Sequence, residues 1–195
     1  MWGKTMILKS LARPSATTAL LLAALLTACG GAESQDGAEL TVPEGFDACT
    51  VLTPERAHAV AGKPIARITS TLEDAQGRGP LYCPYNAGTI EQPEMVGLEI
   101  RPLASARVAA SRMDSARPYL ERMSKKTIQE VQGIGDAAYW VPGLQQLHTR
   151  KGSALVVVTV QASEQPLDDA QSIARDTFAA VEAAAEAART EKPGA

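Results

Sequence analysis

The segment from Ala154 to Ala162 limits most strongly what this chain can fold into. It is nearly continuous in valine and leucine, so it lacks the alternating pattern of a half-buried strand. β-Branched residues in a run of this length favour a strand, and a strand without a polar face is buried on both of its faces. The chain is therefore expected to contain a sheet with this segment inside the domain.

Shorter segments with strand composition lie at 65–72, 81–85, 94–101, 127–131, 137–141 and 145–150. Helices are expected at 54–61, at 104–125 and from Asp168 or Asp169 onward. Thr53 is a good N-cap, Pro54 suits the first helical position and Gly62 suits the end of the first helix. Pro118 is expected to kink or split the second helix.

The connections between these strands are short, which favours antiparallel pairing. The predicted fold class is α+β, an antiparallel sheet with helices packed on one face. Each half of the chain runs as strands followed by a helix, so the sheet is expected to consist of two strand-strand-strand-helix halves, with one extra helix at the start of the first half.

Residues 1–28 have the three parts of a secretory signal, with basic residues first and an apolar run from Ala16 to Leu26. That run is shorter than the ~20 residues that a membrane-spanning helix needs. The signal closes on Leu26-Thr27-Ala28-Cys29, which looks like a lipobox and predicts lipidation at Cys29. The alternative is an ordinary signal peptide followed by an incidental cysteine.

Three further regions are expected after the signal. Residues 29–45 would be the lipidated cysteine and a flexible linker, because they are small and polar. Residues 46–189 would form a single domain and 190–195 a frayed tail. The lipid would anchor the protein in the cell envelope, in the outer membrane if the host has two membranes and otherwise on the outer face of the cell membrane.

Charge excludes one class of partner. The signal holds Lys4, Lys9 and Arg13 and no acidic residue, so residues 29–195 carry 16 basic and 22 acidic side chains and a formal charge of −6. An acidic domain is a poor match for nucleic acid or for anionic lipid headgroups. Contact with the membrane is therefore expected through the N-terminal lipid alone.

Cys49 and Cys83 are the only cysteines after Cys29. An even pair in an exported chain predicts a disulfide, which would close a loop of about 35 residues. A metal pair would need further ligands, and a redox pair would usually be close in sequence, as in Cys-x-x-Cys. Both remain as alternatives.

Several short motifs together resemble a known family. They are 47–55 (Asp-Ala-Cys-Thr-Val-Leu-Thr-Pro-Glu), 82–85 (Tyr-Cys-Pro-Tyr), 131–140 (Val-Gln-Gly-Ile-Gly-Asp-Ala-Ala-Tyr-Trp) and the Lys151-Gly152 hairpin before the valine-rich strand. The chain resembles the small envelope lipoproteins of the DUF3558-like family from about 47 to 181. The resemblance implies an exported lipoprotein with one disulfide and an α+β fold, and it brings no functional residues.

No pattern in the chain predicts catalysis, a metal or a cofactor. His58 and His148 are expected to be structural, and Gly133-Ile134-Gly135-Asp136 lacks the third glycine and the strand-then-helix context of a phosphate loop. The acidic residues Glu164, Asp168 and Asp169 suit a helix start. The aromatic residues Tyr82, Tyr85, Tyr139 and Trp140 would form a recognition surface only if they gathered on one face of the sheet.

Three functions follow from these observations. The first is a non-enzymatic interaction or accessory domain that binds an envelope protein or glycan. The alternative is a small-molecule or lipid carrier with a cavity between the sheet and the long helix, softened by Met95, Met113 and Met123. A hydrolase would require His148, Asp136 and a serine to meet in a cleft.

Overall fold

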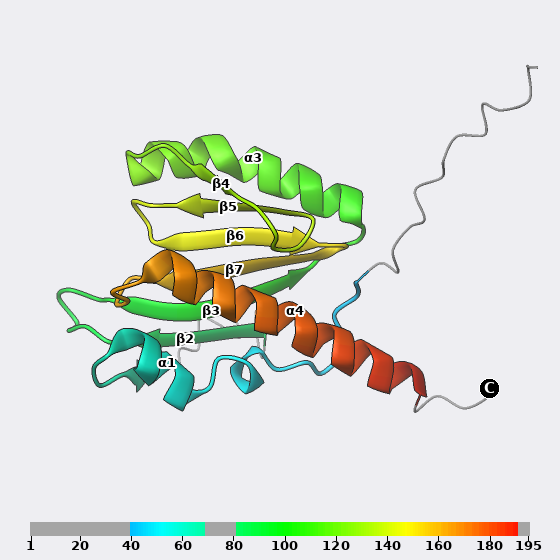
Figure 1. Cartoon of the computed structure of the whole chain (residues 1–195), viewed down its shortest axis with the longest axis horizontal. Helices are drawn as coiled ribbons and strands as arrows, with labels where there is room; N and C mark the ends of the chain where they lie inside the picture. The colour runs from blue at the N-terminus through cyan, green and yellow to red at the C-terminus, as the bar shows by residue number, and fades with distance from the viewer. Residues whose placement is uncertain (1–39, 69–80, 191–195) are drawn as a thin grey trace, which may run out of the picture. The chain divides into compact units, whose positions relative to one another are not determined.

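The computed structural model describes residues 40–68 and 81–190 (Figure 1). The strands are β1 (Ala66–Arg67), β2 (Tyr82–Asn86), β3 (Met95–Pro102), β4 (Gln129–Val131), β5 (Ala137–Val141), β6 (Gln146–Lys151) and β7 (Ala154–Val160). The helices are α1 (Pro54–Ala61), α3 (Ala106–Ser124) and α4 (Pro166–Thr190), preceded by the 3₁₀ turn η1 (Ala48–Thr50). All pairs in the sheet are antiparallel, so the predicted α+β class is confirmed.

The sheet order β1-β2-β3-β7-β6-β5-β4 follows from two meanders that meet in the middle. The first half supplies β1 to β3 and the second supplies β4 to β7, each followed by a helix. Strand β7 pairs with β3 on one side and with β6 on the other. Six of its seven residues are buried, which confirms that the valine-rich segment is buried on both faces.

The start of the folded chain is held by local signals that the sequence predicts. The Thr53 hydroxyl oxygen accepts a hydrogen bond from the Arg56 amide at 3.3 Å, and Pro54 occupies the first helical position. Gly62 ends α1 in the left-handed region, with φ of 63°, and its amide donates to the His58 carbonyl. Helix α1 therefore begins and ends where the sequence predicts.

The expectation that the helices pack on one face of the sheet is wrong. In α4, Ile173 and Phe178 pack in the same cluster as Trp140 and Val156, whereas in α3 Met113 packs with other strand residues in a separate cluster. Side chains on successive strand residues point to opposite faces, and the α3 cluster contains Tyr139, Val141 and Leu155. Helices α1 and α4 therefore cover one face and α3 covers the other.

The topology explains why α3 lies on the second face. Strand β3 is central and β4 is at the edge, so the chain must pass β7, β6 and β5 between them. Helix α3 is this crossover, and it contacts β5, β6 and β7. The opposite face is already occupied by α4, which lies across the sheet in Figure 1.

Two other helix expectations differ from the structure. Pro118 does not split α3, which continues from Ala106 to Ser124. Both Pro118 and Asp114 are exposed, so solvent can satisfy the carbonyl that loses its partner at the proline. Helix α4 begins at Pro166 rather than at the predicted aspartates, because the Ser163 hydroxyl accepts from the Gln165 amide at 2.9 Å and organises the preceding turn.

The folded part begins earlier than predicted. Leu40 lies in the expected flexible linker but is 6% exposed and belongs to the main core cluster. Its carbonyl accepts a hydrogen bond from the Ser153 hydroxyl at 3.0 Å. The predicted signal at 1–28, Cys29, residues 69–72 of the predicted 65–72 strand and residues 191–195 of the predicted tail lie outside the described residues.

Candidate functional site

A cleft of about 400 Å³ lies between α3 and the sheet face that α3 covers in part. Its floor comes from β3, β6 and β7, and its wall comes from one side of α3. Helix α3 contacts β5, β6 and β7, so the part of this face formed by β2 and β3 is left beside the helix. Volumes of this size fall within the range of small-molecule sites.

Most of the cleft surface is apolar. The wall of α3 contributes Met113 and Leu120, and the floor contributes Leu155 and Val157 from the central strand β7. Met95 closes one end from β3. Two of the three methionines that the sequence suggests for a carrier cavity therefore line it; Met123 has 54% of its surface exposed and does not.

A chain of polar side chains crosses this floor. The Gln146 amide nitrogen donates to the Thr159 hydroxyl at 3.2 Å, and its oxygen lies 3.3 Å from Nε2 of His148. These contacts assign the proton of the neutral imidazole to Nε2 and leave Nδ1 as an acceptor. Burial, together with the charge of Arg101, lowers the pKa of His148 from 6.5 to about 4. The residue is therefore neutral near pH 7.

Tyr139 supports His148 from the neighbouring strand. The two rings stack with centroids 5.2 Å apart and planes inclined by 18°. The Tyr139 hydroxyl donates to the Met113 carbonyl at 3.2 Å, which joins α3 to the sheet at the base of the cleft. Burial raises the pKa of Tyr139 to about 12, so the phenol stays protonated and the hydrogen bond is kept.

Three charged side chains reach the cleft, namely Glu99, Arg101 and Arg112. Arg101 binds Glu99 in a bidentate manner, with nitrogen–oxygen distances of 2.7 and 2.8 Å. The Glu99 side chain is only 13% exposed, and its hydrogen bonds to Arg101 raise the pKa of the guanidinium further. Arg112 forms no ion pair with any described residue.

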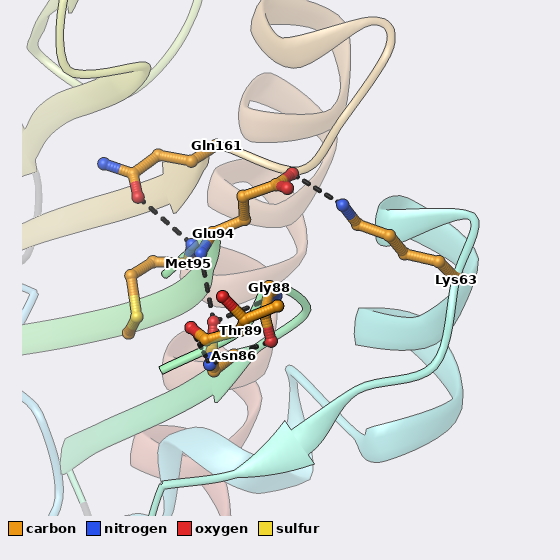
Figure 2. A network of polar contacts seen from close by, with 7 residues as sticks. All are labelled: Lys63, Asn86, Gly88, Thr89, Glu94, Met95 and Gln161. Atoms are coloured by element: carbon orange, nitrogen blue, oxygen red, sulfur yellow. Dashed lines mark hydrogen bonds and ion pairs between the residues drawn. The ribbon is translucent and has the colours of Figure 1, made fainter. Parts of the chain in front are cut away.

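The far end of the cleft is fixed by a polar network around the β2–β3 hairpin (Figure 2). The Asn86 carboxamide oxygen accepts from the amides of Gly88 and Glu94, each at 3.0 Å. The Met95 amide donates to the Gln161 side-chain oxygen at 3.1 Å. Because Met95 and Gln161 both line the cleft, this network holds that end in place without a ligand.

Gly97 opens the floor of the cleft from the middle of β3. A Cβ atom at this position would meet only Cys83 O and Pro84 Cα, both at 3.8 Å, which is ordinary contact. The glycine is therefore not required by crowding, although glycine inside a strand costs roughly 0.5–1 kcal/mol relative to alanine. A glycine in such a place is typical of a strand that another molecule approaches closely.

The structure places the other residues singled out in the sequence away from this cleft or divides them. Cys49 and Cys83 form the predicted disulfide. The four aromatic residues do not gather, because Tyr82 and Tyr139 line the cleft while Tyr85 and Trp140 belong to the opposite core.

The glycine-rich segment and the helix-start acids have structural roles. Gly133 and Gly135 form the turn before β5, both with positive φ. Asp136 accepts hydrogen bonds from Arg150 and from the Gly152 amide, so it stays outside the cleft and does not meet His148. Asp169 accepts from the Ser163 hydroxyl at 2.5 Å.

His58 does not line the cleft. It lies in α1, and its carbonyl accepts a hydrogen bond from the Gly62 amide at the end of that helix. Within 40–68 and 81–190, no three metal-ligating side chains gather, and no helix there is long and apolar enough to cross a membrane. No protein-family model and no curated protein matches the chain.

Sequence reasoning missed Gly97, Glu99, Gln146 and Thr159 as cleft residues. Glu99 and Gly97 interrupt an otherwise apolar strand, which was a usable signal. Gln146 and Thr159 meet only through the β6–β7 register, and no spacing in the sequence announces that contact.

His148 is expected to make the fold sensitive to acid. Its folded pKa of about 4 lies below the unfolded value of 6.5, so the unfolded chain binds the proton more tightly. Stability is fully present above pH 6.5 and falls as the pH drops toward 4, by about 2–3 kcal/mol for this residue. The groups that face it are Arg101 and Glu99 from β3, Arg112 from α3 and Tyr139 from β5.

Urea unfolding of the parent chain and of His148→Gln at pH 7 and pH 4 measures this effect. Carboxylates titrate in both proteins, so their contribution cancels in the comparison. The variant is expected to lose about 2–3 kcal/mol less than the parent between the two pH values. Equal losses would show that His148 is not held neutral by the fold.

Proposed function

We propose that this chain is an envelope lipoprotein, anchored through Cys29, whose folded domain binds a small molecule in the cleft between α3 and the sheet without catalysing a reaction. The cleft at Gly97 is the observation that carries the binding proposal. It combines a volume of about 400 Å³, apolar walls and a few polar groups, which together are typical of ligand sites.

The chemistry of the floor also favours a ligand. His148 is 9% exposed, and Gln146 is the one hydrogen-bond partner of its ring among the described residues. A buried imidazole nitrogen without a partner costs free energy, which a bound hydroxyl, amide or water would recover. The base of the cleft and the end at Met95 are held by hydrogen bonds already described, so little ordering would be needed there on binding.

A second function, interaction with an envelope protein or glycan, is favoured by the β2–β3 hairpin. Ile90 at its tip is 93% exposed, while the loop is fixed by the Asn86 side chain and by the bond from the Thr89 amide to the Gln92 carbonyl at 3.1 Å. A rigid loop that presents one apolar side chain suits a contact with a partner. The cleft involves more of the fold, so we place ligand binding first.

The anchoring proposal rests on the lipobox and on the resemblance to DUF3558-like lipoproteins. In a Cys29→Ser variant no thiol remains to accept a diacylglyceryl group, so the protein should leave the membrane fraction and lose its acyl chains. Membrane fractionation measures whether the protein leaves the membrane, and the intact mass measures whether it carries acyl chains. The parent chain is the control for both. A variant that stays membrane-bound and acylated would contradict the lipoprotein proposal.

The binding proposal is tested by filling the cleft from its floor. Gly97 is suited to this because a side chain there would enter the cleft without striking the backbone. A substitution that removes small-molecule binding but leaves the fold intact supports the cleft as the site. If a chain with a filled cleft binds the small molecule as tightly as the parent chain does, the binding site lies on another surface.

A further inference from the structure

The charges around the cleft are unequal. Arg101 and Arg112 contribute two positive charges and Glu99 contributes one negative charge. The Glu99 carboxylate is already occupied by the bidentate contact with Arg101, so Arg112 is in excess. This excess stands out in a domain whose overall charge is negative, because clefts concentrate the field of the charges that line them.

The interior of the cleft adds no charge of either sign. His148 is neutral near pH 7, and Gln146 and Thr159 supply neutral hydrogen-bonding groups. A cationic ligand group would meet Arg101 and Arg112 as like charges. An anionic group would pair with Arg112 and leave the Glu99–Arg101 contact intact.

The apolar surface sets the rest of the ligand. Met113 and Leu155 pack in one cluster, and Val157 follows Leu155 on the same face of β7 and also lines the cleft. These apolar side chains suit an aliphatic body. The cleft volume of about 400 Å³ lies near the lower end of the range for small-molecule sites. It therefore suits one chain rather than a lipid with two.

We propose that the ligand of this cleft is a single-chain anionic amphiphile, with its anionic group at Arg112 and its aliphatic chain between α3 and the floor of β3 and β7. This inference rests on the proposed binding function and adds the chemical class of the ligand. The shared chemistry is one negative group on one chain, whether it comes from a free fatty acid or from a lysophospholipid of the membrane.

Three probes with similar alkyl chains and differently charged headgroups test the inference. Decanoate, decanamide and decyltrimethylammonium are titrated calorimetrically into the purified full chain, with Gly97→Val as the blank for binding outside the cleft. Decanoate is expected to bind about fivefold more tightly than decanamide, and the cation most weakly. Equal or reversed affinities would overturn the inference and leave the binding function intact, whereas no binding by any probe would overturn the binding function.

Charge variants give effects of opposite sign. Arg112→Gln should weaken decanoate binding about fivefold without changing decanamide binding, because Arg112 has no described ion-pair partner to lose. Arg107→Gln is the matched control, since Arg107 is exposed on the same helix but does not line the cleft. Glu99→Gln should strengthen decanoate binding. If Arg107→Gln and Arg112→Gln weaken binding equally, the attraction is general and the proposed headgroup position is wrong.

The source of the ligand is settled with vesicles. Phosphatidylcholine vesicles that contain lysophosphatidylglycerol are incubated with the Cys29→Ser chain, which has no lipid anchor, and with the Cys29→Ser/Gly97→Val chain, and the lipid recovered with protein after removal of vesicles is measured. Recovery only with the chain that keeps Gly97 would identify a membrane lysolipid as a ligand. Binding of decanoate without recovery of lysolipid would identify the free acid. Equal recovery with both chains, together with equal decanoate binding, would overturn the proposal.

Discussion

The Gly97→Val variant is expected to bind decanoate about 50-fold more weakly than the parent chain. The three carbon atoms of valine would occupy the space of about three ligand methylenes, each worth about 0.8 kcal/mol, and a loss of about 2.4 kcal/mol corresponds to that ratio. The side chain would stand between Pro84 and Thr159, the register partners of Gly97 on either side. It would therefore enter the cleft rather than the opposite core.

The same variant is expected to be more stable than the parent. Glycine inside a strand costs roughly 0.5–1 kcal/mol, valine is favoured in strands, and its Cβ would find only contacts at 3.8 Å. Urea unfolding should therefore show a gain of about 1 kcal/mol. A substitution that stabilises the fold and removes binding separates function from folding, which a disruptive substitution cannot do.

Gly97→Ala is the graded control for this variant. Its single methyl group should weaken decanoate binding about fourfold, by the loss of about one methylene of contact, and should keep most of the gain in stability. Calorimetric titration and urea unfolding on the three chains give both quantities. If valine at 97 leaves decanoate binding unchanged, the cleft is not the binding site.

Most of the fold was predictable because it is encoded locally. The Thr53-Pro54 entry and Gly62 exit define α1 within the sequence itself, and the alternation at 94–101 predicts β3 to within a residue. The placement of α3 was not local. It depends on the order of strands that are distant in sequence, although the two-sided burial of β7 already required cover on both faces.

The candidate site was predictable only in outline. A cavity between the sheet and the long helix belonged to the alternative carrier hypothesis, which named Met95, Met113 and Met123, and only the first two line the cleft. Its polar floor was not predicted, because Thr159 meets Gln146 only through the register of β6 and β7, although Gln146 and His148 already share one face of β6. Cys29 lies outside the described residues, so the lipid anchor remains a prediction from the sequence.

Removal of the disulfide is expected to cost about 3–4 kcal/mol of stability. Cys49 and Cys83 are 34 residues apart, and closing a loop of that length restricts the unfolded chain by roughly this amount in the chain-entropy model. The link joins η1 to β2, and Cys83 is fully buried in the main core. Urea unfolding of a Cys49→Ala/Cys83→Ala double variant measures the cost, with the reduced parent chain as a control that keeps both side chains.

Decanoate binding should survive this large loss of stability. Cys83 points into the core beneath α1 and α4, whereas its neighbour Tyr82 lines the cleft on the other face. Successive strand residues face opposite sides of the sheet, so removing the bond disturbs the face that does not bind. Under conditions in which the double variant is folded, its decanoate affinity should be within about twofold of the parent. A much larger loss would show that the sheet transmits the change, and that the two faces do not behave as independent layers.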